Sequence, residues 1–483
     1  MEIPQKPLCN TVSPTGKAIV LMKSNVDMCR GPILRGIIRY TIPIILTNFL
    51  HLAFNAADLI VVGRFCGSLS VAAVGATGAL TATFVNLFNG MSIGTGVCVA
   101  QSAGAGSKRQ LHRAVHTTVP LALLLGISMT AIALCFAPGI LRVMGTPEDI
   151  LPLSTTYVRI FFFGITLDLL YNYSAAVLRA IGESRKPLIF LTSAGVLNVA
   201  LNLLFVIGFK MDVAGVALAT TLSKLLSAAL VLASLMRRTD ACKLRLREMH
   251  IYKAQLFKIL HIGIPAGIQA SLFGIANITV QSSVNSLGSV VVSGNAAAAN
   301  IGNFICTGMN SVSTAAMNFI GQNVGAQNPR RVRQIYHTCL ALVTVVGMAM
   351  SALLWIFARP LLGIYITDSP QAIDYGVLRV TVVGLSYFLC GMVDVSSSSI
   401  RGMGVSVITM FNSLLGACGL RILWILTVFS LPQFHTPVGL YLCYPVSWAI
   451  TFLAHAITYR IVFHRWVDRI HGAREKEAVP AKV

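Results

Sequence analysis

The stretch QNVGAQNPRRVRQIYH, residues 322–337, matches QSAGAGSKRQLHRAVH, residues 101–116. Each stretch opens on Gln, carries a Gly-Ala pair before a basic run, and ends on His. Further matches occur in the same order: residues 178–182 with 400–404, and 215–223 with 439–447. Matches that keep their order along a chain indicate an internal repeat. The sequence therefore consists of two copies of one unit.

The composition is too apolar for a water-soluble globule of this length. Of the 483 residues, 55% are hydrophobic and only 11% are charged, and the mean hydropathy is +0.76. Lipid must therefore cover much of the surface. Stretches of the roughly 20 apolar residues that cross a bilayer recur twelve times, too long for β-barrel strands. They are 35–62, 72–100, 114–137, 154–180, 187–208, 213–236, 257–287, 291–320, 336–358, 373–400, 405–430 and 437–463. The predicted fold is an all-α integral membrane protein.

The net charge of +21 is distributed as expected for a membrane protein rather than a nucleic-acid-binding protein. Lys and Arg gather in every second connection, whereas the alternate connections hold acidic residues such as Glu148 and Asp374. Under the positive-inside rule the basic connections are cytoplasmic. We therefore predict a multi-pass protein of the cytoplasmic membrane with both termini inside, and no nucleic-acid partner.

Six spans in each copy mean that both copies enter the membrane in the same sense. Such parallel repeats are related by an axis along the membrane normal, with a solute path in the central cleft between two six-helix lobes. The predicted organisation is a cytoplasmic segment 1–34 without a secretory signal, an amino-terminal lobe 35–236, a basic linker 237–256, a carboxy-terminal lobe 257–463 and a cytoplasmic tail 464–483. Eleven scattered cysteines contain no C-x-x-C pair, and no disulfide framework is expected.

Several segments resemble the multidrug and toxic compound extrusion family, most closely its DinF-like branch. They are AADLIVVGRFCGSLSVAAVGATG (56–78), AQSAGAG, GQNVGAQ, LRAIGESRKPL (178–188), LNVALNLLF (197–205) and GVALATTLS (215–223). They follow the family's order over nearly the whole chain. The resemblance implies export of amphipathic, often cationic organic compounds by alternating access, driven by inward movement of H⁺ or Na⁺, without other cofactors. We expect a monomer whose partners are these small organic substrates and the lipid bilayer.

Asp58 is the first candidate for coupling chemistry. It lies late in the first span, where an ionised side chain is costly and usually faces the protein interior. One interpretation is a helix-end residue that bonds Asn55 or water near the outer interface. The resemblance implies instead the acidic residue of a cation site, with Asn198, Asn202 and Thr220 as its partners. Asn198 and Asn202 are four residues apart and so share one helix face.

This chain departs from the family pattern at Asn202, where many relatives carry a second Asp. The substitution removes a negative charge and a proton acceptor from the site, so cation affinity should fall. Carboxylate, amide and hydroxyl oxygens suit Na⁺, so Na⁺ at Asp58, Asn198, Asn202 and Thr220 stays open. The loss of the second acid favours H⁺, with Asp58 as the sole titrating group of that lobe.

Other polar residues inside the spans are candidates for lining the cleft or binding substrate. Asp168 precedes Asn172 by one helical turn, and Asn172 corresponds in the repeat to Asp394. Asp394 precedes Arg401 by two turns, so it forms either an internal ion pair or a local counter-charge to the serine run 396–399. Three spaced amides of the seventh span are cleft-lining contacts or glue between helices: Gln269, Asn277 and Gln281.

The repeated His116 and His337 are expected to anchor the chain at the interface. Pro43, Pro265 and Pro445 interrupt spans and either permit bending or are ordinary kinks.

Three other classes of protein are disfavoured by the sequence. A lipid-linked saccharide or lipid flippase of the same superfamily is the main alternative. Basic residues should line the cleft of such a flippase, whereas the charged residues at membrane depth in this chain are expected to be few and acidic. An enzyme would need a convergent catalytic cluster, and a channel a repeated filter sequence, and neither is found. The absence of G-x-x-x-x-G-K-[ST] argues against ATP hydrolysis. We therefore predict a secondary active exporter that is not an enzyme.

Overall fold

The computed structural model describes residues 26–367 and 369–478, and these residues form helices without a single strand. Residues 1–25 of the predicted amino-terminal segment and 479–483 of the predicted tail lie outside this description. Contacts divide the chain into two compact units. Unit 1 contains Ile42–Gly267, and unit 2 contains Met28–Thr41 together with the residues from Ile268 onward.

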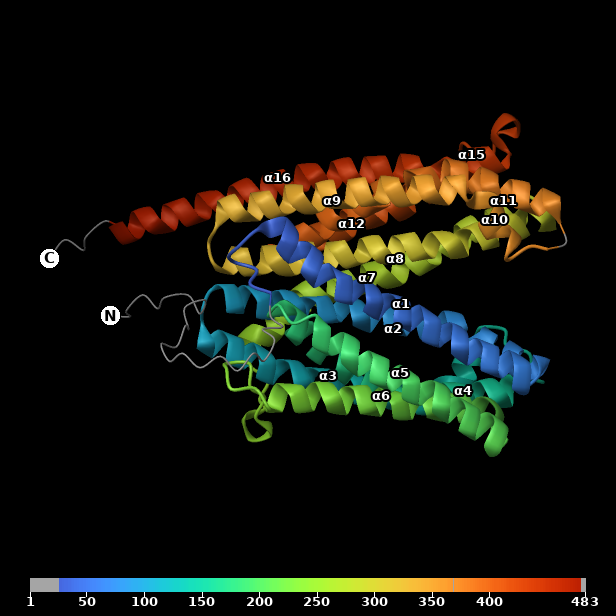
Figure 1. The fold of residues 1–483 in the computed structure, drawn as a ribbon, viewed down its shortest axis with the longest axis horizontal. Coiled ribbons are helices and arrows are strands. Elements are labelled where there is room, and N and C mark those ends of the chain that lie inside the picture. Colours follow the sequence, from blue (N-terminus) through green and yellow to red (C-terminus); the bar gives the residue numbers. More distant parts are fainter. Residues whose placement is uncertain (1–25, 368, 479–483) are drawn as a thin grey trace. The chain divides into compact units, whose positions relative to one another are not determined.

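Unit 1 is built from long helices joined by short turns (Figure 1). They are most of α1 (Ile33–Phe65), α2 (Ser68–Gly104), α3 (Lys108–Val143), α4 (Leu151–Ala180), α5 (Arg185–Leu203) with its π-helical continuation η1 (Leu204–Gly208), α6 (Asp212–Met236), the short η2 (Leu246–Glu248) and the first half of α7 (Lys253–Asn285). The helix α4 packs extensively on α2, on α3 and on α6.

Unit 2 repeats this arrangement with more interruptions. It contains the second half of α7, α8 (Ser289–Gly325), α9 (Pro329–Ile356), α10 (Ala358–Gly363), α11 (Pro370–Val382), η3 (Gly384–Ser386), α12 (Tyr387–Gly402), α13 (Val407–Ser413), η4 (Leu414–Gly419), α14 (Leu420–Leu426), η5 (Pro432–Phe434), α15 (Pro437–Tyr441) and α16 (Cys443–Ala478). Pro445 lies in the first turn of α16, directly after the break at Leu442 that separates α15 from α16 inside the apolar segment Pro437–Gly472, so the span is interrupted here as expected.

Eleven helical segments in the described part of the chain are long and apolar enough to cross a membrane. The helix α8, which corresponds to the predicted span 291–320, is equally long but carries several Asn, Ser and Thr side chains. Together they account for the twelve predicted spans, and the all-α membrane fold is confirmed. Large apolar side chains exposed on these helices, such as Ile127 and Leu415, provide the surface that lipid covers.

The internal repeat is visible in the backbone of the connections. Gly182 and Gly404, which end the matching segments after α4 and α12, both have a positive φ near 90° (91° and 92°). Gly106 and Gln327 are likewise both left-handed. The next residues, Ser107 and Asn328, cap α3 and α9 through side-chain oxygens that accept backbone N–H groups. The two copies therefore fold their turns in the same way.

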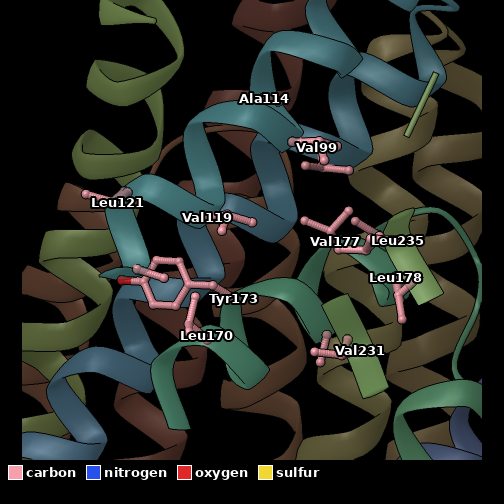
Figure 2. Packing of buried hydrophobic residues seen from close by; sticks show 14 of the residues in the cluster. Val99, Ala114, Val119, Leu121, Leu170, Tyr173, Val177, Leu178, Val231 and Leu235 are labelled. Atoms are coloured by element: carbon pink, nitrogen blue, oxygen red, sulfur yellow. The ribbon is translucent and has the colours of Figure 1, made fainter. Parts of the chain in front are cut away.

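The core of unit 1 is an apolar cluster between α3, α4 and α6 (Figure 2). Val119, Tyr173 and Val231 belong to it and are almost fully buried. At the ends of the same cluster, Cys242 and Leu244 of the linker are also buried. The linker is thus part of the packed structure of unit 1 and not a free tether.

Glycine allows α2 to approach the first half of α7 very closely. A Cβ placed on Gly94 would lie 2.0 Å from the carbonyl oxygen of Ile259, and one on Gly263 would lie 2.5 Å from that of Met91. Only residues without a side chain permit this helix separation. The glycine-rich string NGMSIGTG thus serves close packing, as its composition indicates.

The compact units differ from the sequence repeat at two places. The amino-terminal part of α1 packs within unit 2, where Asn318 donates a hydrogen bond to the Tyr40 hydroxyl at 3.0 Å. The first half of α7 packs within unit 1. Each helix passes from one unit to the other within two residues of Pro43 or Pro265.

Candidate functional site

The structure brings Asp58, Asn198, Asn202 and Thr220 together inside unit 1. The amide nitrogen of Asn202 donates to Asp58 Oδ1 at 2.5 Å, and the Thr220 hydroxyl donates to Asp58 Oδ2 at 3.3 Å. Asn198 donates to Thr220 Oγ1 at 3.3 Å and accepts from Asn202 at 3.4 Å. Three helices thus converge on one carboxylate, and both of its oxygens accept hydrogen bonds.

The helix α5 presents both asparagines to this cluster because they lie one turn apart. Both side chains are buried, and Asn202 is completely inaccessible to solvent. The helix changes to the wider π-helical form η1 directly after Leu203. Such π-bulges inside helices often occur at functional sites, since they reorient the following side chains.

One oxygen of the cluster has no partner. Asn202 Oδ1 is buried and accepts no hydrogen bond from any described residue. A buried acceptor without a donor is unfavourable, and it is a free ligand for a positive ion. With Asp58, Asn198 Oδ1 and Thr220 Oγ1 it forms a set of oxygen ligands of the kind that hard cations prefer. The donor set therefore fits either Na⁺, if the Asn202 amide turns its oxygen inward, or a proton on Asp58.

Asp58 has no fixed basic partner. Among the residues that the structure describes, no Lys, Arg or His nitrogen lies within 4.0 Å of its carboxylate. Lys224, one turn along α6 from Thr220, interacts electrostatically with Asp58 without forming an ion pair with it. A carboxylate that is held only by neutral donors can exchange them for a cation or a proton.

Asp168 is ion-paired rather than free. Lys224 Nζ lies 3.6 Å from Asp168 Oδ1 and sits 4.5 Å from the centre of the Phe161 ring. Asn172 donates to the other oxygen of Asp168 at 3.2 Å. Lys224 was not among the residues predicted from the sequence, although it is a lone lysine inside the span 213–236. The expectation that membrane-depth charges are few and acidic is therefore wrong.

The remaining sequence candidates lie in unit 2. Gln269 is buried and accepts a hydrogen bond of 2.6 Å from Arg401, while Asp394 is hydrogen-bonded by Asn310. Within the described residues, no ion pair of 4.0 Å or less joins Asp394 to Arg401. The other two amides are exposed: Asn277, and Gln281, which donates to Asn285 and accepts from Asn295.

The linker is attached to unit 1 by a second polar network. His116 Nε2 accepts the backbone N–H of Arg245 at 3.1 Å, and the Thr117 hydroxyl accepts that of Tyr252 at 3.2 Å. His116 is fully buried, so it fastens the linker and does not lie at a membrane interface as expected. Further along, Arg238 bonds both Glu183 and Asp240. Burial alone would raise the pKa of Asp240, but the hydrogen bonds from Arg238 lower it below its usual value.

A metal ion is a poor fit to the histidines at this end. His112, His116 and Glu248 lie close enough together to share one. However, His116 uses Nδ1 on the carbonyl of His112 and Nε2 on the Arg245 amide, and Glu248 is ion-paired with Arg245. A metal would have to displace the linker, so we interpret the group as an anchor.

Two cavities of the described structure lie away from the Asp58 cluster. One of about 530 Å³ lies beside the linker at the ends of α5 and α6, and its walls include Phe190, Leu230 and Arg237. Another of about 510 Å³ is apolar and lies between α8, α9 and α10, beside Phe304 and Leu353. None of the four residues of the Asp58 cluster lines either cavity.

Known proteins resemble the chain in both sequence and fold. The MatE family model matches residues 43–204 and again 265–427. The probable multidrug resistance protein YoeA of Bacillus subtilis is 26% identical over 88% of this chain and 93% of its own length. YpnP of the same organism, also a probable multidrug resistance protein, is 28% identical over 82% of this chain and 88% of its own length. An FAD transporter of Shewanella oneidensis is 23% identical over 79% of this chain and 84% of its own length.

Solved structures share the fold at lower sequence identity. An outward-facing multidrug resistance MATE family transporter superposes with a TM-score of 0.85 at 20% identity, covering 92% of this chain and 98% of its own. A MATE protein in a bent conformation superposes with a TM-score of 0.82, covering 92% of this chain and 99% of its own. The family model matches most of the chain in two successive copies, in agreement with the repeat. The chain therefore belongs to the MatE family of membrane transporters and is not an enzyme.

Proposed function

We propose that this transporter exports amphipathic organic compounds across the cytoplasmic membrane in exchange for an inward-moving cation, with both termini in the cytoplasm. The curated relatives that are named as multidrug resistance proteins support the substrate class. They also make the flippase alternative the weaker one. Assignment to the DinF-like branch stays a prediction.

The observation that carries the coupling proposal is the surroundings of Asp58. Its carboxylate is held by Asn202 and Thr220, and by no described cation. When Asp58 takes up a proton, it no longer accepts both hydrogen bonds, and the links between α1, α5 and α6 weaken. A proton or ion that binds one conformation more tightly than the other shifts the population toward it. Uptake at Asp58 thereby drives the change of access.

The coupling ion is a proton in this proposal. Asn202 supplies an amide where a second carboxylate would provide the negative charge that a Na⁺ site needs. Asp58 is then the single proton carrier of unit 1. Pro43 and Pro265 lie where α1 and α7 pass between the units, and we assign the bending needed for alternating access to these two positions.

The test is efflux of a fluorescent organic cation from vesicles containing the reconstituted protein, with pH and Na⁺ gradients imposed separately. We expect a pH gradient alone to drive transport, and Asp58→Asn to abolish that response. Asp468→Asn, at an exposed position of α16, is the matched control and should transport normally. Full gradient-driven efflux by Asp58→Asn would remove Asp58 from coupling.

A further inference from the structure

Unit 2 contains two buried arginines that form no ion pair with any acid in the described part of the chain. Arg379 on α11 is 7% exposed and Arg421 on α14 is 5% exposed. Both lie in segments long and apolar enough to span the membrane. Throughout residues 26–367 and 369–478, no carboxylate oxygen lies within 4.0 Å of either guanidinium. Arginine remains charged in proteins, so two positive charges are enclosed here.

Aromatic rings surround the two guanidiniums. The Arg421 guanidinium lies 4.4 Å from the centre of the Tyr444 ring and 5.6 Å from that of Trp448. The Arg379 guanidinium lies 5.9 Å from the same Tyr444 ring. Ring faces attract cations, but they leave the N–H groups at the edge of a guanidinium unpaired. The rings hold the charges in place without neutralising them.

Several polar groups of this cluster lack hydrogen-bond partners. Arg421 Nε donates to Ser447 Oγ at 3.1 Å, and Arg379 bonds the Tyr387 hydroxyl. The Nε of Arg379 and the hydroxyl of Tyr441, which interacts electrostatically with Arg379, are both buried and find no partner among the described residues. Buried donors of this kind are normally satisfied by protein, water or an ion. Two unpaired donors beside two uncompensated positive charges point to an anion.

The repeat shows that this polarity is reversed between the units. Tyr444 occupies the position in unit 2 that Thr220 occupies in unit 1, within the matching segments 439–447 and 215–223. Counted from the equivalent Pro43 and Pro265, Val280 stands where Asp58 stands. Unit 1 therefore has a carboxylate at this place, and unit 2 has arginines instead of an acid.

We propose that Arg379 and Arg421 form a site for a small anionic group, supplied either as free chloride or as the carboxylate of an exported compound. The group would accept hydrogen bonds from Arg379 Nε, the Tyr441 hydroxyl and the free N–H edge of Arg421. The second source rests on the proposed export function. The first source does not.

Thermal unfolding of the purified full-length protein tests for the site without any transport. At constant ionic strength, replacing methanesulfonate with chloride should raise Tm by roughly 3 °C when chloride is present at about a hundred times its Kd. Arg421→Gln and Arg379→Gln should each abolish this shift. Arg460→Gln removes the same charge at an exposed position of α16 and should keep it. If Arg421→Gln does not fold, Arg421→Lys replaces it. This variant keeps the positive charge and should show a smaller rise in Tm than the unchanged protein.

Replacing methanesulfonate with benzoate under the same conditions distinguishes the two sources. Stabilisation by chloride indicates a free inorganic anion, whereas stabilisation by benzoate alone indicates a carboxylate of the substrate. In the second case Arg421→Gln should lose efflux of rhodamine 110, which has a free carboxylate, and retain efflux of its methyl ester rhodamine 123. The proposal is overturned if neither anion stabilises the protein, or if Arg421→Gln responds as the unchanged protein does. Absence of all dye efflux would count against the export function, while the Tm result would still stand.

Discussion

Replacing Asn202 with Asp would restore the second carboxylate that the site lacks, and we expect it to convert the site to Na⁺ binding. The Asn202 amide now lies 2.5 Å from Asp58 Oδ1, so the new carboxylate would face Asp58 directly. Two unit charges at about 4 Å with an effective dielectric constant near 20 repel each other by about 4 kcal/mol. A bound Na⁺ or proton relieves that repulsion, and 4 kcal/mol corresponds to roughly a thousandfold gain in affinity.

The assay for Asn202→Asp is efflux from vesicles driven by a Na⁺ gradient at equal pH on both sides. The unchanged protein should respond weakly, and Asn202→Asp should respond at a Na⁺ concentration at least roughly tenfold lower, a conservative fraction of the calculated gain. Asn300→Asp, at an exposed position of α8, controls for the added charge. If Asn202→Asp needs as much Na⁺ as the unchanged protein, the reasoning about charge at this site is refuted.

Two further predictions concern packing and the linker. Gly94→Ala should lower the free energy of unfolding by about 1–3 kcal/mol, because the new Cβ would meet the Ile259 carbonyl. Gly75→Ala places its Cβ in open space and should leave the free energy of unfolding unchanged. Thermal melts of the two variants compare these effects. The pKa of Asp240 is lowered in the folded protein, so its contribution to linker stability is full above pH 4 and is lost as pH falls through the folded value. The protection factors for hydrogen exchange at residues 237–252, which correct for the intrinsic pH dependence of amide exchange, should therefore fall below pH 4. Asp240→Asn should remove that fall; protection that falls equally in the variant contradicts the assignment.

Sequence reasoning succeeded where the physical signal is local. Membrane spans follow from runs of apolar residues, and the duplication follows from matched turns whose glycines share a backbone conformation, as Gly182 and Gly404 do. Asn198 and Asn202 share a helix face by spacing alone. Their meeting with Asp58 and Thr220 was expected through the family resemblance, since no local pattern relates three separate helices.

Sequence reasoning failed where a charge is neutralised by a residue on another helix. Lys224 pairs with Asp168 across α6 and α4, and Arg421 stacks on Tyr444 across α14 and α16. Each of these side chains is an isolated charge or ring in its own span. The choice between a free acid and an ion-paired one therefore required coordinates. So did the finding that, among the described residues, no acid pairs with Arg379.

The sequence by itself determined that this chain is a duplicated helical membrane protein, because lipid solubility and helix length depend only on composition along the chain. Tertiary structure alone decided which buried charges are compensated. Compensation depends on distances of a few ångströms between helices that are far apart in sequence, and the energy of a charge in a membrane changes sharply over such distances. Asp58 among neutral donors and Arg379 beside aromatic rings are both products of that packing.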